Sequence, residues 1–191
     1  MQDSALKYLI AEDMLRYGLK KKLTPLSFIR YFYVEAIPGL KFTVIFRYCQ
    51  HYRRRNRLLF YFFYLWLRRL RVKYGIDISY RTKIGKGLYI GHFGGIVIHG
   101  DAEIGAHCNL SQGMTIGVSV RGSNVGIPKI GNRVFFGPGA VILGGITVGD
   151  DVLIGTNAIV TFDVPNKSVV ASPLATIVSS RGSADYIMNT Q

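Results

Sequence analysis

The feature that most constrains the fold of this sequence is an apolar residue that recurs at every sixth position in its C-terminal half. The series runs in strict phase through Ile130, Phe136, Ile142, Val148, Ile154 and Val160. A second apolar residue follows four positions after each of them: Val134, Ala140, Ile146, Val152, Ala158 and Val164. A period of six fits neither an α-helix nor an alternating strand. It is the hexapeptide pattern of a parallel β-helix, in which three short strands and three turns make one coil. The repeated residues are therefore expected to point inward and to stack on their copies in adjacent coils.

The same phase continues toward the N-terminus with two interruptions. It passes through Ile78, Ile84, Ile90, Ile98, Ile104, Leu110 and Ile116. The first interruption inserts two extra residues after Ile90, beside His92, and the second expels the loop 118–129 after Ile116. Since a solenoid accepts insertions at its turns, and such insertions commonly carry binding residues, both interruptions are candidate walls of a functional site.

Composition divides the chain into two unlike parts. Residues 1–75 hold 16 Lys and Arg against 4 Asp and Glu, whereas the remainder holds 8 against 7. We therefore expect a basic, aromatic-rich and helical head over residues 1–75, a β-helical body over 76–178 and a tail over 179–191. The two cysteines form no disulfide framework and have no metal-ligand spacing. No basic start followed by a continuous apolar run is present, so a cytoplasmic protein is expected.

Four stretches of the body carry a family resemblance. They are "GIDISYRTKIGKGLYIGHFGGIVI", "NLSQGMTIG", "PKIGNRVFFGPGAVILGGITVGDDVLIGTNAIV" and "DVPNKSVVASPLA", and together they cover residues 75–178. In order and spacing they resemble the serine acetyltransferase family of hexapeptide-repeat acyltransferases. The resemblance implies a mainly β fold, a left-handed parallel β-helix. It also implies a homotrimer, with pairing of two trimers left open, and acetyl-CoA as co-substrate in clefts between subunits.

The resemblance also assigns two catalytic residues. The family's catalytic histidine stands in a "His-x-x-Gly" motif, which is His92 here, and the aspartate that orients it falls on Asp77. The chemistry agrees, because acetylation of a hydroxyl needs a base near neutral pKa to take the proton as the oxygen attacks the thioester. A carboxylate on the second ring nitrogen would hold the tautomer and stabilise the imidazolium.

Small residues of the later coils match the family's contacts with the pantetheine arm of acetyl-CoA. These expected contacts are Gly117, Gly137, Ala140 and Ala158. The backbone N–H groups near Gly117 are also candidates for stabilising the oxyanion. The family's basic residue after its closing turn is replaced here by Thr176, which leaves Lys167 or Arg181 to contact the CoA phosphates.

A metal site is the weaker reading of the clustered histidines. His99 is expected to face out of its strand, and His107 to lie at a turn or a subunit interface. The spacings of seven and eight between His92, His99 and His107 do not resemble those of the zinc-dependent β-helix hydratases. We therefore expect no metal.

The motifs around the expected acceptor pocket depart from those of serine-specific members. Those members carry an acidic residue before the catalytic histidine and an Arg-His pair before the "Pro-Lys" that resumes the repeat. Here Gly91 and the pair Gly126-Ile127 stand at those positions. A charged amino acid needs charged partners in its pocket. The sequence therefore predicts a sugar or glycan acceptor, of the exopolysaccharide or capsule type, and a poor affinity for serine. The alternatives are a serine O-acetyltransferase of cysteine biosynthesis and a non-catalytic scaffold at the membrane.

The basic head suggests a surface contact. The apolar run 58–67 is too short to span a bilayer, and arginines flank it on both sides. Interfacial helices combine basic and aromatic residues in this way, so an anionic membrane surface is one candidate partner of residues 41–73, which would make the protein peripheral. The other is helix packing, within the head or against another trimer. No nucleic-acid motif is present, so nucleic acid is not expected as a partner.

Overall fold

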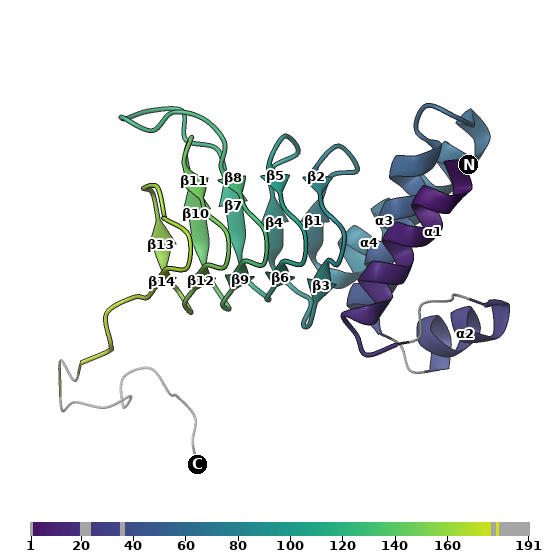
Figure 1. The fold of residues 1–191 in the computed structure, drawn as a ribbon, viewed down its shortest axis with the longest axis horizontal. Coiled ribbons are helices and arrows are strands. Elements are labelled where there is room, and N and C mark those ends of the chain that lie inside the picture. The colour runs from purple at the N-terminus through teal and green to yellow at the C-terminus, as the bar shows by residue number, and fades with distance from the viewer. Residues whose placement is uncertain (1, 20–23, 35–36, 177–178, 180–191) are drawn as a thin grey trace, which may run out of the picture.

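The computed structural model describes residues 2–19, 24–34, 37–176 and 179 of the chain. A helical head lies at one end of a β-helical body, and the expelled loop projects from the far half of the body (Figure 1). The head contains α1 (Gln2–Leu15), α2 (Pro25–Ile29), a π-helical segment η1 (Arg30–Val34), α3 (Pro38–Tyr52) and α4 (Arg57–Tyr74). None of these described helices is long and apolar enough to cross a membrane.

The body consists of short parallel strands arranged in three sheets. The first sheet contains β1 (Ile76–Ile78), β4 (Ile96–Ile98), β7 (Thr115–Gly117), β10 (Val141–Leu143) and β13 (Ile159–Val160). The second contains β2 (Lys83–Ile84), β5 (Glu103–Ile104), β8 (Lys129–Ile130) and β11 (Thr147–Val148). The third contains β3 (Tyr89–Ile90), β6 (Asn109–Leu110), β9 (Phe135–Phe136), β12 (Leu153–Ile154) and β14 (Val169–Val170). Each strand pairs with the strand one coil away, which is the arrangement of a parallel β-helix and confirms the predicted fold class.

The hexapeptide positions form the core of the body. All thirteen members of the repeat, from Ile78 to Val160, are buried. Their ladder partners are their copies in the neighbouring coil, as for Ile98 against Ile116 and Ile142 against Val160. One residue type therefore recurs because each coil presents the same inward position to the same narrow interior.

One corner of the coil requires a left-handed backbone. It is occupied by glycine with positive φ at Gly75, Gly95, Gly113 and Gly139, and by Asn157 at φ 55° in the last coil. Glycine adopts this conformation without the steric cost of a Cβ. The two residues inserted after Ile90 enlarge this corner. The second insertion forms an exposed loop closed by two backbone hydrogen bonds between Ser119 and Gly126.

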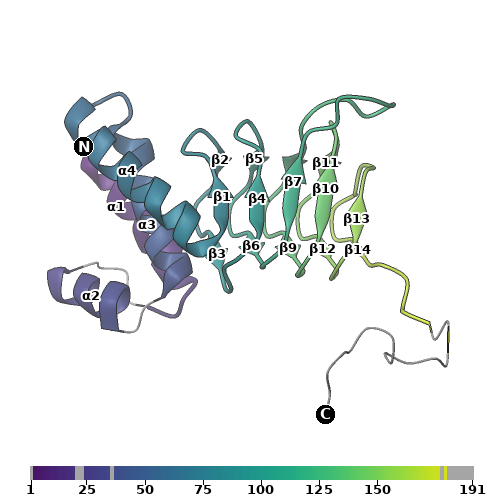
Figure 2. The same cartoon turned by 180° about the vertical axis from the view of Figure 1, so that it is seen from behind.

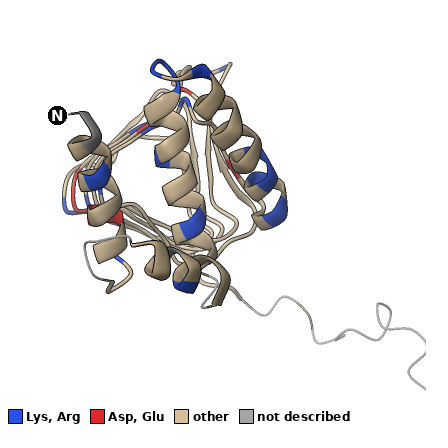
Figure 3. Ribbon diagram, turned by 90° about the vertical axis from the view of Figure 1, so that its right-hand side faces the viewer, with Lys and Arg blue, Asp and Glu red and all other residues tan. Residues whose placement is uncertain are grey.

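The head covers the open end of the first coil (Figures 2 and 3). Arg47 of α3 donates to the carbonyl oxygens of Ile84 and Gly85 at 2.7 and 2.6 Å. It also forms a buried ion pair with Asp13 of α1, whose carboxylate accepts from the Leu88 N–H at 2.8 Å. These side chains satisfy polar backbone groups of β2 and β3 that have no further coil to pair with.

The head and the body also share one apolar core. Leu67 and Leu70 of α4 and Phe46 of α3 are buried in the same cluster as the hexapeptide residues. The head is therefore packed as a cap on the solenoid. α4 begins at its N-cap Asn56 and ends at Gly75, whose φ of 59° lets the chain turn directly into β1.

Candidate active site

His92 lies on the enlarged corner between β3 and β4. Its side chain is exposed and lines a cavity of about 360 Å³. The other residues that line this cavity are Tyr89, Gly91, Asn109, Leu110, Ser111, Gln112, Phe135 and Pro138. A Cβ at position 91 would lie 3.0 Å from the ring of Tyr89, so a side chain there would require that ring to shift slightly. The predicted base is thus open to solvent and reachable by a substrate.

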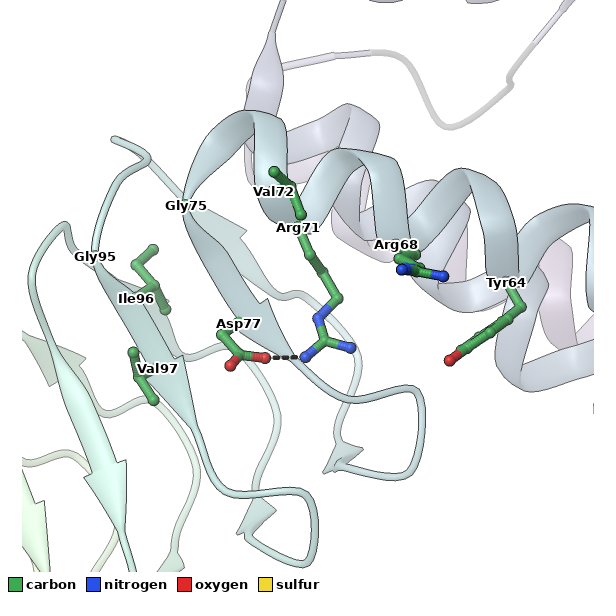
Figure 4. A pocket seen from close by; sticks show the side chains of 9 residues that line it. All are labelled: Tyr64, Arg68, Arg71, Val72, Gly75, Asp77, Gly95, Ile96 and Val97. Carbon is green, nitrogen blue, oxygen red and sulfur yellow. Dashed lines mark hydrogen bonds and ion pairs between the residues drawn. The ribbon is translucent and has the colours of Figure 1, made fainter.

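Asp77 lies on the outer face of β1 and lines a different cavity. This cavity, which we call the α4 cavity, has a volume of about 540 Å³. Its lining consists of Tyr64, Arg68, Arg71, Val72, Gly75, Asp77, Gly95, Ile96 and Val97 (Figure 4). The carboxylate of Asp77 pairs with the guanidinium of Arg71 on α4. Among the described residues, no hydrogen bond or ion pair joins Asp77 to His92.

The two cavities are nevertheless neighbours. The ring of Phe93, next to His92, lies 5.4 Å from the ring of Tyr74 at the end of α4. Gly75 packs closely against the backbone of Gly94 and Gly95. The turn that carries His92 therefore lies against the helix end that carries Arg71.

One residue of the His92 cavity was missed by sequence reasoning. The side-chain oxygen of Gln112 is buried and has no hydrogen-bond partner. A buried acceptor without a donor is costly, and it is often satisfied by a ligand. The repeat could not have singled it out, because Gln112 occupies a turn position between two regular strands.

The predicted acetyl-CoA contacts lie on several coils. Ala140 and Ala158 sit side by side in adjacent coils with buried side chains, so only their backbone could meet a ligand. Their carbonyl oxygens already accept ladder bonds, from Thr115 at 2.8 Å and from Val141 at 2.9 Å. Small residues let a pantetheine arm come close to the backbone at these positions. The carbonyl oxygens of Ala140 and Ala158, however, are already engaged in ladder hydrogen bonds.

The remaining predicted contacts differ in exposure. Gly117 ends β7, and a Cβ at Gly137 would run into the backbone of the adjacent coil near Thr156. Lys167 is exposed at a left-handed corner with φ 60°. Arg181 lies outside the described residues. The assignment of all these positions to acetyl-CoA stays a prediction.

The other histidines have structural contacts. The Nδ1 atom of His99 accepts from the Asp101 N–H at 3.2 Å. His107 adopts φ 60° at a coil corner, with its ring against Gly87. Within the described part of the chain, no group of three or more His, Cys, Asp or Glu side chains is placed to hold a metal ion.

Comparisons with known proteins indicate the class of protein to which this chain belongs. Residues 127–161 match the family model of the bacterial transferase hexapeptide (six repeats). The chain is 37% identical over 171 residues to serine acetyltransferase of Helicobacter pylori strain 26695, an alignment that covers 87% of this chain and 98% of the relative. It is 39% identical over 100 residues to serine acetyltransferase of Mycobacterium tuberculosis strain H37Rv, covering 52% of this chain and 44% of the relative.

Solved structures agree with these relatives. Serine acetyltransferase isoform 3 of Entamoeba histolytica, in complex with cysteine, matches with a TM-score of 0.73 at 27% identity, over 93% of this chain and 62% of that one. The Neisseria gonorrhoeae enzyme matches with a TM-score of 0.69 at 26% identity, over 90% of this chain and 67% of that one. This chain thus spans less than two thirds of the Entamoeba structure.

The fold and the family model define the class: a β-helical protein with the hexapeptide repeats of bacterial transferases. The extent and identity of the Helicobacter match place it further: the chain belongs to the serine acetyltransferase family. It is accordingly an acetyl-CoA-dependent acetyltransferase.

Two expectations from the sequence need correction. The sugar or glycan acceptor of the exopolysaccharide or capsule type is wrong, because the relatives and structural neighbours are serine acetyltransferases. That expectation weighed only Gly91, Gly126 and Ile127 of the body and left out the head, which also lines a cavity beside Asp77. The resemblance is also wider than residues 75–178, because an alignment of 171 residues has to extend into the head.

Proposed function

We propose that this chain is a serine O-acetyltransferase that transfers the acetyl group of acetyl-CoA to the hydroxyl of L-serine, a reaction of cysteine biosynthesis. The observation that carries the proposal is the 37% identity to the Helicobacter serine acetyltransferase over 98% of that relative's length. Acetyl-CoA supplies the acetyl group as a thioester, which is reactive enough for direct attack by an alcohol once its proton is removed.

His92 is the general base. A ring nitrogen of His92 takes the hydroxyl proton as the serine oxygen bonds to the acetyl carbon. The carbon–sulfur bond breaks, and the same proton passes from the imidazolium to the leaving thiolate. The exposed position of His92 and the polar side chains around it support this role.

Asp77 orients the imidazole in this proposal. One oxygen of its carboxylate pairs with Arg71 in the structure, and the second can accept from His92 while that pair persists. The orienting contact then requires the His92 turn, which lies against Tyr74 through Phe93, to bring the imidazole to Asp77. Backbone N–H groups near Gly117 remain the proposed donors to the oxyanion, with Gly117, Gly137, Ala140, Ala158 and Lys167 as contacts for acetyl-CoA.

We further propose assembly as a homotrimer through the outer faces of the body. Apolar side chains stand in register on the outer face of the third sheet, with exposed fractions of 40% for Phe135, 41% for Leu153 and 72% for Val169. Monomeric surfaces rarely gather such residues, and association would cover them.

The outer face of α4 is a separate contact surface. Leu58, Phe62 and Leu65 recur there at helical spacing and are exposed, with arginines among them. An anionic membrane and a second trimer are the two proposed partners. Sedimentation with vesicles that contain anionic lipid separates them, because only the first partner makes the protein sediment with the vesicles.

The function is tested by a steady-state assay of purified protein with acetyl-CoA and L-serine, with release of free CoA as the readout and free sugars as alternative acceptors. Saturable turnover with L-serine, and O-acetylserine as the product, is the expected result. Turnover with acetyl-CoA and other acceptors, but none with L-serine, would overturn the proposal.

A further inference from the structure

The charges of the α4 cavity do not balance. Arg68 and Arg71 stand three residues apart on α4, so both lie on the helix face that lines the cavity. Asp77 on β1 neutralises Arg71. Arg68 is exposed, and among the described residues no hydrogen bond or ion pair joins it to another group. The cavity therefore presents one uncompensated guanidinium.

The rest of the lining suits a small molecule with one charged end. Val72, Ile96 and Val97 provide apolar walls, and Tyr64 lies one helical turn from Arg68 (Figure 4). A guanidinium recognises a carboxylate through two parallel N–H···O bonds, which fixes orientation as well as charge. An acceptor with a carboxylate fits this wall better than a neutral one.

The α4 cavity also adjoins the proposed base. Gly95 and Ile96 at its edge follow directly on the turn that carries His92, and the ring contact between Tyr74 and Phe93 holds that turn to the end of α4. A ligand held at Arg68 would therefore lie on the His92 side of the first coil.

The two positions of the body directly before Pro128 and Lys129, where the repeat resumes, carry no charge. Gly126 packs with its Cα against Gly145, and Ile127 packs against the apolar core. The basic residues of the expelled loop are Lys129, which is exposed on β8, and Arg121, which lines a separate cavity of about 310 Å³ with Asn124. Arg121 is the competing candidate for binding an anion.

We propose that the α4 cavity is the binding site for the carboxylate of the acceptor amino acid and that Arg68 pairs with it. The inference rests on the proposed serine acetyltransferase function and names the residue that supplies the charge missing at Gly126 and Ile127. In this proposal the residue that binds the acceptor's carboxylate belongs to the head and not to the loop of the body.

The test compares two ligands and four variants of the full chain, Arg68→Gln, Arg68→Lys, Arg69→Gln and Arg121→Gln. L-Serine and L-serinamide share the hydroxyl and the amine but differ in the carboxylate. Arg68→Gln removes the proposed partner. Arg69→Gln removes the same charge from the adjacent residue, which does not line the α4 cavity, and Arg121→Gln tests the competing candidate. Binding is measured by calorimetry at millimolar ligand, and turnover by release of CoA.

Arg68→Gln is expected to weaken L-serine binding and to raise its KM about 10- to 100-fold, the effect of losing a charge-assisted hydrogen bond. Binding of L-serinamide and the KM for acetyl-CoA should stay within about twofold, as should all values for Arg69→Gln. Arg68→Lys, which keeps the charge and loses the fork, should fall between Arg68→Gln and the unaltered protein.

The inference is overturned if Arg68→Gln leaves L-serine unaffected, if it weakens both ligands equally, or if Arg69→Gln or Arg121→Gln has the same effect. Failure of the proposed function has a different signature. The unaltered protein would then bind L-serine in an Arg68-dependent way without acetylating it. Absence of both binding and turnover would overturn the inference together with the function.

Discussion

The head and the body of this protein bury their interiors by different rules. Among the described residues, the body buries a repeated set of aliphatic side chains with one buried polar residue, Thr82. The head buries Asp13, Lys41, Thr43 and Arg47. The difference arises because the body packs against copies of itself, whereas the head has to match the exposed backbone of one coil. The repeated packing of the body produces a period that can be recognised in the sequence. The packing of the head on the first coil depends instead on individual polar contacts, which produce no period.

The largest expected effect is on turnover, and it tests the catalytic role of the body apart from the stabilising role of the head. His92→Ala should lower turnover about 10²- to 10⁴-fold, because it removes the general base. Binding of acetyl-CoA and the stability of the fold should change little, since His92 is exposed. Steady-state kinetics and calorimetry measure the two effects.

His99→Ala is the matched control, because His99 follows seven residues after His92 and its ring accepts a local hydrogen bond from the Asp101 N–H. It should keep most of the turnover. Equal loss in both variants would show that the corner, and not the base, had been damaged.

The second effect concerns the cap. Asp13→Ala leaves Arg47 buried without its counter-ion and should cost about 3–5 kcal/mol of unfolding free energy. Asp13→Leu combined with Arg47→Met removes both buried charges but leaves the carbonyl oxygens of Ile84 and Gly85 and the Leu88 N–H without these partners, so it should recover only a part of that loss. Denaturant unfolding gives both values.

The control for the cap is Arg81→Gln in the body. Its pair with Asp101 has a similar length of 2.9 Å, but both side chains are 55% exposed. Such a pair contributes less than about 1 kcal/mol. If Asp13→Ala costs no more than Arg81→Gln, the buried pair does not fasten the head.

A smaller effect is expected at the left-handed corner of the body. Gly139→Ala should cost about 1–2 kcal/mol, because φ is 69° and a Cβ there would meet the side-chain oxygen of Asn157. Asn157→Gly, at the same corner one coil on, should change stability by less than about 0.5 kcal/mol. Thermal unfolding of the two variants compares them, and a neutral Gly139→Ala would show that the corner tolerates a side chain.

The smallest difference is expected between the two cysteines, one in each part. Burial raises the pKa of the Cys49 thiol and of the Cys108 thiol to about 11. At pH 8 about one thiol in a thousand would be ionised, and the thiolate fraction rises as pH approaches 11. Both thiols should therefore react slowly with iodoacetamide in the folded protein, at rates that rise with pH.

Because the two cysteines belong to one apolar cluster, low denaturant should expose them together, with labelling rates within about threefold. Mass spectrometry of the labelled peptides measures the ratio. Much faster labelling of Cys49 would mean that the head opens while the body stays folded.

Much of the body could be predicted from the sequence. The inward positions, both insertions and the exposed corner at His92 follow from the six-residue period, because each is a local property of one coil. The head could be predicted only as basic and helical. Its contacts join Asp13 to Arg47 and Arg47 to Gly85, and no spacing pattern in the sequence predicts such pairs.

The acceptor was predicted wrongly because the prediction considered only residues of the body. Gly126 and Ile127 correctly indicate that the expelled loop lacks the expected charges, but a charge can be supplied from any segment that folds back to the cavity. Arg68 does so from α4, where sequence reasoning assigned the arginines to a membrane surface or to helix packing. The pairing of Asp77 with Arg71 was hidden for the same reason.

The sequence by itself determined the β-helix and the corner that carries His92, because inward packing in a narrow solenoid demands the same kind of residue at each sixth position. Only the tertiary structure decided which face of α4 meets the first coil. That choice depends on the buried contacts of Leu67 and Leu70, and it brings Arg68 and Arg71 to the cavity at Asp77. A six-residue period is visible in the sequence because each repeated residue packs against its own copies in adjacent coils. A contact between unlike segments, such as α4 and β1, produces no such period and is known only from the packed structure.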